Sequence, residues 1–296
     1  MYVQPFHQRI VAGTPATLSW RLIGADGEPA DPGTVTVTVT RADGSTVVAS
    51  AATSGTATAA RTYALTAAQT AILDRLTVTW LAGAVTLATT EVDVAAAPWF
   101  SNAELRALET SLANESSYPA ATLQRARQQV ETFFERITHR RFSLGYDFRT
   151  IPGAYGYELV VPHREVRRVR SAALHDNPAT AALETLTSTE LAAIPPSPGG
   201  VIVRYENPWR ANWVKIGYEH GFVAPPEDVK RAAMRLCREV LVESKTSSPD
   251  AAVQWNSSDL GWSAVFVTPG VRGAHTRLPW VNEVLDAWTL TDVGIG

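Results

Sequence analysis

Residues 92–104 read VDVAAAPWFSNAE, and the periodicity of the sequence changes within them. Before Ala95, polar and apolar residues alternate, which is the pattern of a half-buried strand. After Pro98, Ser101 is followed three residues later by Glu104, which is the pattern of a capping box at the start of a helix. We therefore place a domain boundary in this stretch and predict an all-β domain before it and a helical domain after it.

The N-terminal part, residues 1–97, is rich in Thr, Val, Ala and Gly. Strict alternation occurs in TVTVTVT at 34–40 and in LTVTWL at 76–81, and it predicts two half-buried strands. Further strands are expected at 17–23 and 85–94, with glycine-containing turns between the strands. Short strands at this spacing predict a small β-sandwich of the immunoglobulin type. Because the periodicity changes at the boundary, we expect the sandwich to fold as a separate, peripheral module.

Residues 98–245 are expected to form a helical domain with a β-rich insertion. One long amphipathic helix follows Pro119, and its apolar stripe comprises Leu123, Ala126, Val130, Phe133, Phe134 and Ile137. A second helix begins at 225–228 (PPED), and its stripe comprises Val229, Ala232, Ala233, Leu236, Val240 and Leu241. The insertion covers about 142–222, and its predicted strands are 157–161, 166–173, 200–205 and 213–218.

Residues 246–296 form a C-terminal extension. After a linker, it is expected to continue as a hairpin at 253–267, a glycine-containing loop at 268–276 and a short helix at 279–288. Such an extension is poorly able to bury its apolar residues alone, so we expect it to dock on a partner. The whole chain is therefore predicted to be α+β, with two domains and an extended tail.

The composition argues against several classes of protein. The chain has 296 residues, of which 45% are hydrophobic and 19% charged, as in ordinary globular proteins. A formal net charge of −3 argues against holding nucleic acid by bulk electrostatics. No run approaches the roughly 20 apolar residues of a membrane-spanning helix, and the first residues lack the order of a secretory signal. We therefore expect a cytosolic or particle-assembled protein, in which the single cysteine, Cys237, is a small buried hydrophobe.

Motifs of common catalytic sites are absent from the sequence. It contains no HExxH, Walker A, GxGxxG or GxSxG pattern. Its six histidines are scattered, and no two are spaced to ligate one metal ion from one helix face. The adjacent carboxylates Glu227 and Asp228 suit the start of a helix better than an acid–base pair. We therefore expect no enzyme, and we predict no catalytic, cofactor-binding or metal site.

Two groups of side chains stand out from this background. The basic group follows the first long helix and continues in the insertion, and it comprises His139, Arg140, Arg141, Arg164, Arg167, Arg168 and Arg170. These residues are either cations at a helix end and a solvated strand edge, or a surface that pairs with acids of a neighbouring subunit or touches phosphates, with subunit pairing favoured over DNA. The aromatic group lies in the extension and comprises Trp255, Trp262, Phe266, Trp280 and Trp288. In a segment with little core of its own, we expect these side chains to be interface anchors.

Four pieces of the sequence occur in a recognisable order. They are VETFFERITHRRF at 130–142, LVVPHREVRRVRSAAL at 159–174, WVKIGYEHGFVAPPEDVKRAAMRLCREVLVES at 213–244 and VTPGVRGAHTRLPWVNEVLDAW at 267–288. In this order they resemble the head-to-tail adaptor (connector) family of long-tailed, siphovirus-type bacteriophages. The resemblance covers about residues 99–290, and the N-terminal sandwich is not part of the family's minimal pattern.

The resemblance implies a structural protein of the virion neck, made in the host cytoplasm, that performs no chemistry and needs no cofactor. Copies of it would form a ring of twelve below the portal protein, and the ring would extend the DNA channel. One face would bind the portal and the other the stopper or tail completion protein, while genomic DNA passes through the lumen without specific binding. The five aromatic residues of the extension are then the predicted portal contacts. The predicted subunit contacts are Glu131, Glu135, Arg140, Arg141, Arg164, Arg167, Arg168 and Arg170.

Three other interpretations stay open from the sequence. The first is a tail or baseplate protein that uses an immunoglobulin-like module for attachment. The second is a carbohydrate-active enzyme in which Glu206, Glu219 or Asp259 acts on sugar, although nothing in the spacing of these residues favours it. The third is a sequence-specific DNA-binding protein, against which the negative net charge counts.

Overall fold

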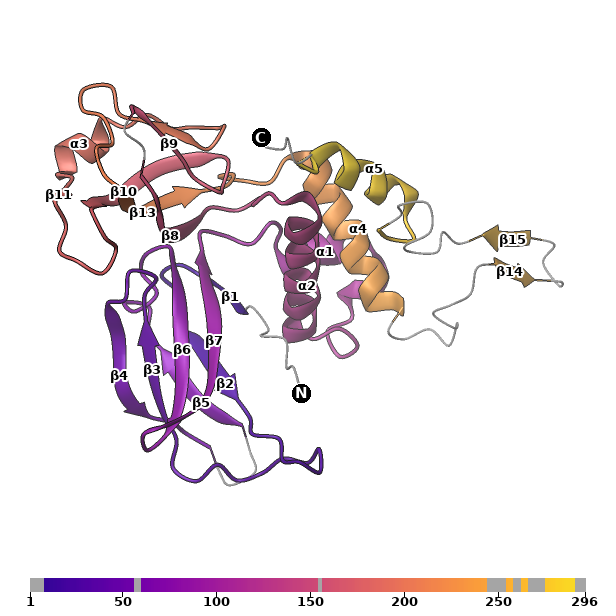
Figure 1. Cartoon of the computed structure of the whole chain (residues 1–296). Helices are drawn as coiled ribbons and strands as arrows, with labels where there is room; N and C mark the ends of the chain where they lie inside the picture. The colour runs from indigo at the N-terminus through magenta and orange to yellow at the C-terminus, as the bar shows by residue number, and fades with distance from the viewer. Residues whose placement is uncertain are drawn as a thin grey trace. The chain divides into compact units, whose positions relative to one another are not determined.

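A computed structural model describes residues 8–55, 60–153, 156–243, 254–257, 262–265 and 275–290, and it is mixed α and β (Figure 1). The contacts divide the chain into two compact units. The first, here called the β unit, comprises residues 1–98 and 143–223. The second, the helical unit, comprises residues 99–142 and 224–296. Each unit is thus built from two separate stretches of the chain.

The N-terminal part of the β unit is a sandwich of two sheets. Its strands are β1 (Gln8–Val11), β2 (Ala16–Trp20), β3 (Thr36–Thr40), β4 (Thr46–Ala52), β5 (Arg61–Leu65), β6 (Asp74–Ala82) and β7 (Val85–Ala95). One sheet has the order β1-β7-β6-β3-β4, in which β1 runs parallel to β7, and the other pairs β2 with β5. The strands predicted at 17–23, 34–40, 76–81 and 85–94 are therefore confirmed, within a few residues at their ends.

The two sheets enclose one hydrophobic core. Leu18 and Leu65 of the smaller sheet are buried in the same cluster as Val37, Leu76 and Trp80 of the larger sheet. Every second residue of β3 and β6 is buried, because the side chains of a strand alternate between its two faces. The sandwich architecture follows from this core, and its assignment to the immunoglobulin type stays a prediction.

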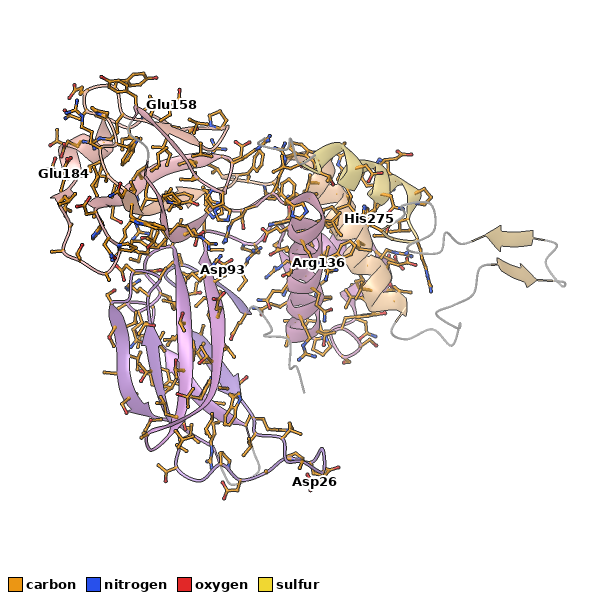
Figure 2. All side chains as sticks on the ribbon, viewed as in Figure 1. Asp26, Asp93, Arg136, Glu158, Glu184 and His275 are labelled. Atoms are coloured by element: carbon orange, nitrogen blue, oxygen red, sulfur yellow. The ribbon has the colours of Figure 1, made fainter. Side chains whose placement is uncertain are left out.

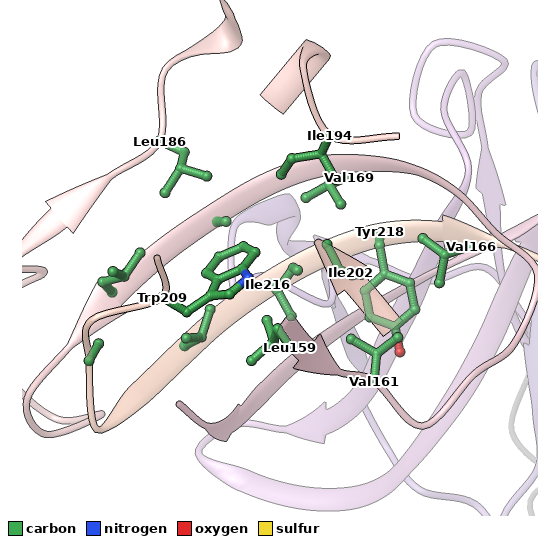
Figure 3. Close-up of a cluster of buried hydrophobic side chains, with 14 residues drawn as sticks. Leu159, Val161, Val166, Val169, Leu186, Ile194, Ile202, Trp209, Ile216 and Tyr218 are labelled. Carbon is green, nitrogen blue, oxygen red and sulfur yellow. The ribbon is translucent and has the colours of Figure 1, made fainter. Parts of the chain in front are cut away.

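The β-rich insertion forms the rest of the β unit. Its elements are β8 (Gly145–Pro152), β9 (Glu158–Val160), β10 (Val166–His175), β11 (Glu184–Thr185), α3 (Ser188–Ala192), β12 (Val201–Val203) and β13 (Trp213–His220). One sheet has the order β11-β10-β13-β8, and β9 and β12 form a separate two-stranded ribbon. Leu159 and Ile202 of the ribbon are buried with Trp209, Ile216 and Tyr218, so one face of the ribbon covers the sheet (Figure 3).

The insertion packs against the sandwich. Asp147 of β8 lies 3.7 Å from Arg75 of β6, and the backbone N–H of Ala96 donates to the carbonyl oxygen of Leu144. The position of the insertion between two amphipathic helices in the chain predicts that it belongs to the helical domain. Contacts instead group it with the sandwich, since periodicity shows which face of an element is apolar but not which neighbour covers that face.

The helical unit contains α1 (Asn102–Leu108), the 3₁₀ helix η1 (Thr110–Ala113), α2 (Ala120–Thr138), α4 (Glu227–Glu243) and α5 (Pro279–Trp288). Ser101 and Glu104 form the predicted capping box at the start of α1. Helix α2 contacts α4, and α5 contacts both. Their fully buried residues include Leu123, Phe134, Val229, Ala233 and Leu285. None of the helices in the described residues is long and apolar enough to cross a membrane.

The C-terminal extension contains the predicted hairpin. Strands β14 (Gln254–Ser257) and β15 (Trp262–Val265) run antiparallel, with Gln254 opposite Val265. Among the described strands, each pairs only with the other. The short helix predicted at 279–288 is also confirmed as α5. This helix is packed in the helical unit, so the extension has two parts with different surroundings.

Candidate assembly surfaces

Glu131, a predicted subunit contact, has an internal position in the helical unit. Its side chain is 1% exposed. One carboxylate oxygen accepts a hydrogen bond from the backbone N–H of Trp99 at 3.0 Å and lies 3.8 Å from Nε of Arg127. Arg127 donates in turn to the carbonyl oxygen of Phe100, and burial lowers its pKa, against the attraction of Glu131. This pair fixes the point where the chain enters the helical unit and offers almost no surface to another subunit.

Arg140 and Trp288 were predicted to contact two different partners, and they lie against each other. The guanidinium of Arg140 is 5.6 Å from the centre of the Trp288 ring. Trp288 also packs edge-on against Phe142 and donates from Nε1 to Asp228 at 2.8 Å. The end of α2, the start of α4 and the end of α5 are joined by this cluster. It accounts for the position of α5 within the helical unit.

The other predicted contacts of the helical unit are only partly covered. Trp280 is half-buried, and the guanidinium of Arg235 lies 4.8 Å from the centre of its ring. Glu135 and Arg141 are half-buried. Trp255 stands opposite Ala264 in the hairpin and Trp262 opposite Ser257. Phe266 lies outside the described residues.

The four arginines of the insertion differ in their surroundings. Arg170 is partly buried, and it contacts the sandwich. Arg168 is 65% exposed and pairs with Glu219 at 2.7 Å. Arg167 donates to the carbonyl oxygen of Gly221, and Arg164 is exposed. Arg164, Arg167 and Arg168 therefore present positive charge to the solvent, whereas Arg170 acts inside the β unit.

The side chain of Tyr146 on β8 passes over Gly217 of β13, the strand that lies between β8 and β10. Its hydroxyl reaches Ser171 on β10, and burial raises the pKa of the phenol. Between them lies Gly217 of β13, where an added Cβ would be 2.1 Å from Oη of Tyr146 and 2.6 Å from Oγ of Ser171. Only a residue without a side chain leaves room for this crossing. Sequence reasoning missed this contact, because a glycine in a strand indicates close approach of another group but does not identify that group.

A buried polar cluster lies beside this crossing. Asp147 accepts a hydrogen bond from Nε of Arg149 at 2.6 Å and lies 3.3 Å from Nδ1 of His163. The same nitrogen of His163 is 2.7 Å from the hydroxyl of Tyr218, whose pKa is raised by burial and by Asp147. The ring of His163 stacks on His220 at 3.9 Å. In the described part of the chain, no three His, Cys, Asp or Glu side chains are grouped so as to hold a metal ion.

The buried thiol of Cys237 fits the expected hydrophobic role. It is fully buried on α4, and burial raises its pKa to about 12. A thiol with so high a pKa is almost entirely protonated at neutral pH and is a poor nucleophile.

Comparison with known proteins gives two solved structures to which the chain is similar. One is a chain of the virion of a native gene transfer agent particle, with a TM-score of 0.45. The other is a chain of the neck of an empty gene transfer agent particle computed with C6 symmetry, with a TM-score of 0.41. In both cases the identity is 14%, and the match covers 67% of this chain and 93% of the other. No protein-family model and no curated protein matches the sequence. At this identity and these TM-scores, the similarity assigns no function to the chain.

Proposed function

We propose that the chain is a structural protein of the neck of a phage-like particle, the setting from which one of the two similar solved chains comes. In this proposal it is a head-to-tail adaptor. Twelve copies form a ring below the portal protein, extend the DNA channel and receive the stopper or tail completion protein on the opposite face. In this role the protein acts through its shape and its contacts, and it catalyses no reaction.

The order of the folded elements carries this proposal. Helix α2 is followed by the β-rich insertion, then by α4, the extension and α5, which returns to α2 and α4. The pieces of sequence that resemble the adaptor family occur in the same order. Those at 130–142, 213–244 and 267–288 supply the contacts between α2, α4 and α5. The helical parts of these pieces therefore belong to one folded unit, and the piece at 159–174 belongs to the insertion.

The charge of the protein suits a channel through which DNA passes. A ring that neutralised several phosphates per subunit would retain DNA strongly and in a salt-dependent way. This chain has a net charge of −3, and its charges of both signs are interspersed. Such a surface can surround DNA without holding it. A closed ring also requires two different complementary surfaces on each subunit, which mixed charges can provide.

The hairpin of the extension is the proposed portal contact. A two-stranded hairpin alone in water is marginally stable at best, so strands as short as β14 and β15 gain from a partner surface. Trp255 and Trp262 lie on these strands, and tryptophan is enriched among the residues that contribute most to binding. Together with Phe266, they are the residues of the extension that we propose to anchor the ring to the portal.

The experiment is to delete the gene in the cells that produce the particle and to complement it with the tagged full-length chain. We expect filled or empty heads that carry no tails after deletion, and a ring of the tagged chain directly below the portal in cryo-EM images after complementation. A ring or layer in the tail or baseplate would support the attachment-module alternative instead. Absence of the chain from particles, or turnover of a glycan by the purified protein, would overturn the proposal.

A further inference from the structure

The two ends of the insertion sheet carry opposite charge. The end where Val166 of β10 lies opposite His220 of β13 carries four arginines and three acids: Arg164, Arg167, Arg168 and Arg170, with Asp147, Glu165 and Glu219. We call this the basic end. The other end, where His175 lies opposite Trp213, carries five acids and three basic residues: Glu158, Asp176, Glu184, Glu190 and Glu206, with Arg204, Arg210 and Lys215. We call this the acidic end.

The acidic end also carries an exposed tyrosine. The β9–β12 ribbon buries Leu159 and Ile202, so the alternate residues face away from the sheet. Of these, Glu158 and Val203 lie at the end of the ribbon nearer the acidic end, whereas Val160 and Val201 lie at the end that continues toward Ser197 and Val166. Tyr205, which follows the ribbon, is 74% exposed. Tyrosine is enriched in protein interfaces relative to the rest of the surface.

Acids lie beside this tyrosine. Glu158 lies on the ribbon and Glu206 follows Tyr205, and both are exposed. Glu184 reaches Arg204, the neighbour of Tyr205, at 3.1 Å. Figure 2 labels Glu158 and Glu184, which both lie on the insertion. Acids beside an exposed tyrosine suit a partner that brings arginines, because arginine pairs with carboxylates and also stacks on aromatic rings.

The basic end offers the matching group. Arg164 and Arg168 are exposed, and the pairing of Arg168 with Glu219 leaves most of its side chain in solvent. Both ends belong to the same folded insertion, so every copy of the chain carries both in a fixed relation. Two complementary surfaces at opposite ends of one rigid element produce a head-to-tail contact, which closes a ring when the rotation between copies allows it.

We propose that the acidic end of the insertion binds the basic end of the insertion of the next copy, and that this contact sets the register of the ring. The inference rests on the proposed ring and names the surfaces that build it. In the contact, Tyr205 loses solvent, and Glu158 and Glu206 pair with Arg164 and Arg168 of the neighbouring copy. DNA is not the occupant of the acidic end, since phosphates would be repelled there.

Cross-linking in assembled particles tests the geometry. The full chain carries Arg164→Cys together with Tyr205→Cys, and purified particles are treated with a bifunctional maleimide. The native Cys237 is buried and protonated, so it stays out of the reaction. We expect a ladder of covalent multimers from the double variant and monomers from each single variant. Monomers from the double variant in particles that contain the ring would overturn the proposal.

A charge exchange tests the energetics. The acid-end variant is Glu158→Arg with Glu206→Arg, and the base-end variant is Arg164→Glu with Arg168→Glu. Either variant alone places like charges in every contact. We expect the fraction of necks that carry the chain to fall by about tenfold or more. In an equimolar mixture, a ring in which the two variants alternate has opposite charges in every contact, and the fraction of necks that carry the chain should return to within about twofold of the wild type.

A matched control separates this contact from others. Arg125→Glu with Arg231→Glu reverses the same charge at two exposed positions of the helical unit. We expect no rescue of the acid-end variant by this control. If the control rescues it and the base-end variant does not, the acidic end binds the helical unit and the proposal is wrong. If the wild-type chain is absent from necks, the proposed function fails as well, whereas a wild-type ring with unaffected variants overturns this inference alone.

Discussion

Arg170 and Leu73 are 97 positions apart in the chain, and Nη1 of Arg170 donates a hydrogen bond of 2.7 Å to the backbone carbonyl oxygen of Leu73. Leu73 precedes β6 of the sandwich, and Arg170 lies on β10 of the insertion. The guanidinium also lies 4.4 Å from the centre of the Tyr146 ring. This side chain thus joins the sandwich to the insertion, together with the Arg75–Asp147 pair and the hydrogen bond from Ala96 to Leu144.

Replacing Arg170 with Ala should destabilise the β unit. The carbonyl of Leu73 loses its charged donor, and leaving such a group unsatisfied costs about 1–3 kcal/mol. Arg168→Ala is the matched control, because Arg168 is mostly exposed and surface ion pairs contribute about 0–1 kcal/mol. Hydrogen exchange of amides in β6, β8 and β10 measures the difference. Equal protection in the two variants would show that Arg170 does not join the two parts.

Gly217→Ala should destabilise the insertion, because the new methyl group would meet the hydroxyl of Tyr146 and Oγ of Ser171. Overpacking of this kind costs about 1–3 kcal/mol. Adding Tyr146→Phe removes the nearest oxygen and should recover part of the loss in urea unfolding. The recovery is partial because Cζ of Tyr146 lies 2.9 Å from the added Cβ position. A double variant no more stable than Gly217→Ala would contradict this account.

The carboxylate of Glu131 should matter for folding and not for contacts between subunits. Glu131→Ala leaves Arg127 without its counter-ion and the N–H of Trp99 without its acceptor in a buried site, and breaking a buried ion pair costs about 3–5 kcal/mol. Glu131→Gln can still accept the hydrogen bond from the N–H of Trp99, so we expect this variant to lose less stability than Glu131→Ala. Glu115→Ala is the control, since the side chain of Glu115 is largely exposed. Thermal unfolding followed by helical circular dichroism ranks the three variants.

The sequence predicted most elements but not all of their neighbours. Alternation identified β3 and β6, and three-to-four spacing identified α2 and α4, because these patterns reflect which face is buried. Strand β8 was not predicted individually, since its buried residues include Gly145 and Asp147, which break the apolar pattern. For Glu131 the available signal was a carboxylate next to the apolar stripe and four residues after Arg127. Such a pair is ordinarily exposed on the helix surface. Here its burial depends on Trp99, a residue 32 positions away in the chain, and helical periodicity does not predict that contact.

Stability should respond to acid through Glu104. Its hydrogen bonds with Lys230 and with the backbone and side chain of Ser101 lower its pKa to about 2. A carboxyl with a lowered folded-state pKa stabilises the fold above its usual pKa of 4.5, and this contribution is lost as the pH falls from there toward about 2. Glu104→Gln should therefore be less stable than wild type at pH 7, and the difference should vanish near pH 2. A difference that stays constant from pH 7 to pH 2 would show that the charge of Glu104 is not responsible.

The two parts of the C-terminal extension should respond differently to removal. Helix α5 buries Val281 and Leu285 in the helical unit, and the backbone N–H of Leu290 donates to the carbonyl oxygen of Thr138. Each such side chain contributes about 1.5–3 kcal/mol when fully buried. Deleting residues 246–296 should therefore lower the unfolding temperature of the helical unit and expose apolar surface on α2 and α4.

Replacing only residues 253–267 with a Gly-Ser linker of equal length leaves α5 in place, and we expect it to keep the wild-type unfolding temperature. Because that variant lacks Trp255, Trp262 and Phe266, it should nevertheless lose portal binding in a pull-down with purified portal protein. Retained binding would exclude the hairpin as the portal contact. An unchanged unfolding temperature after deletion of 246–296 would instead show that α5 is not needed by the helical core.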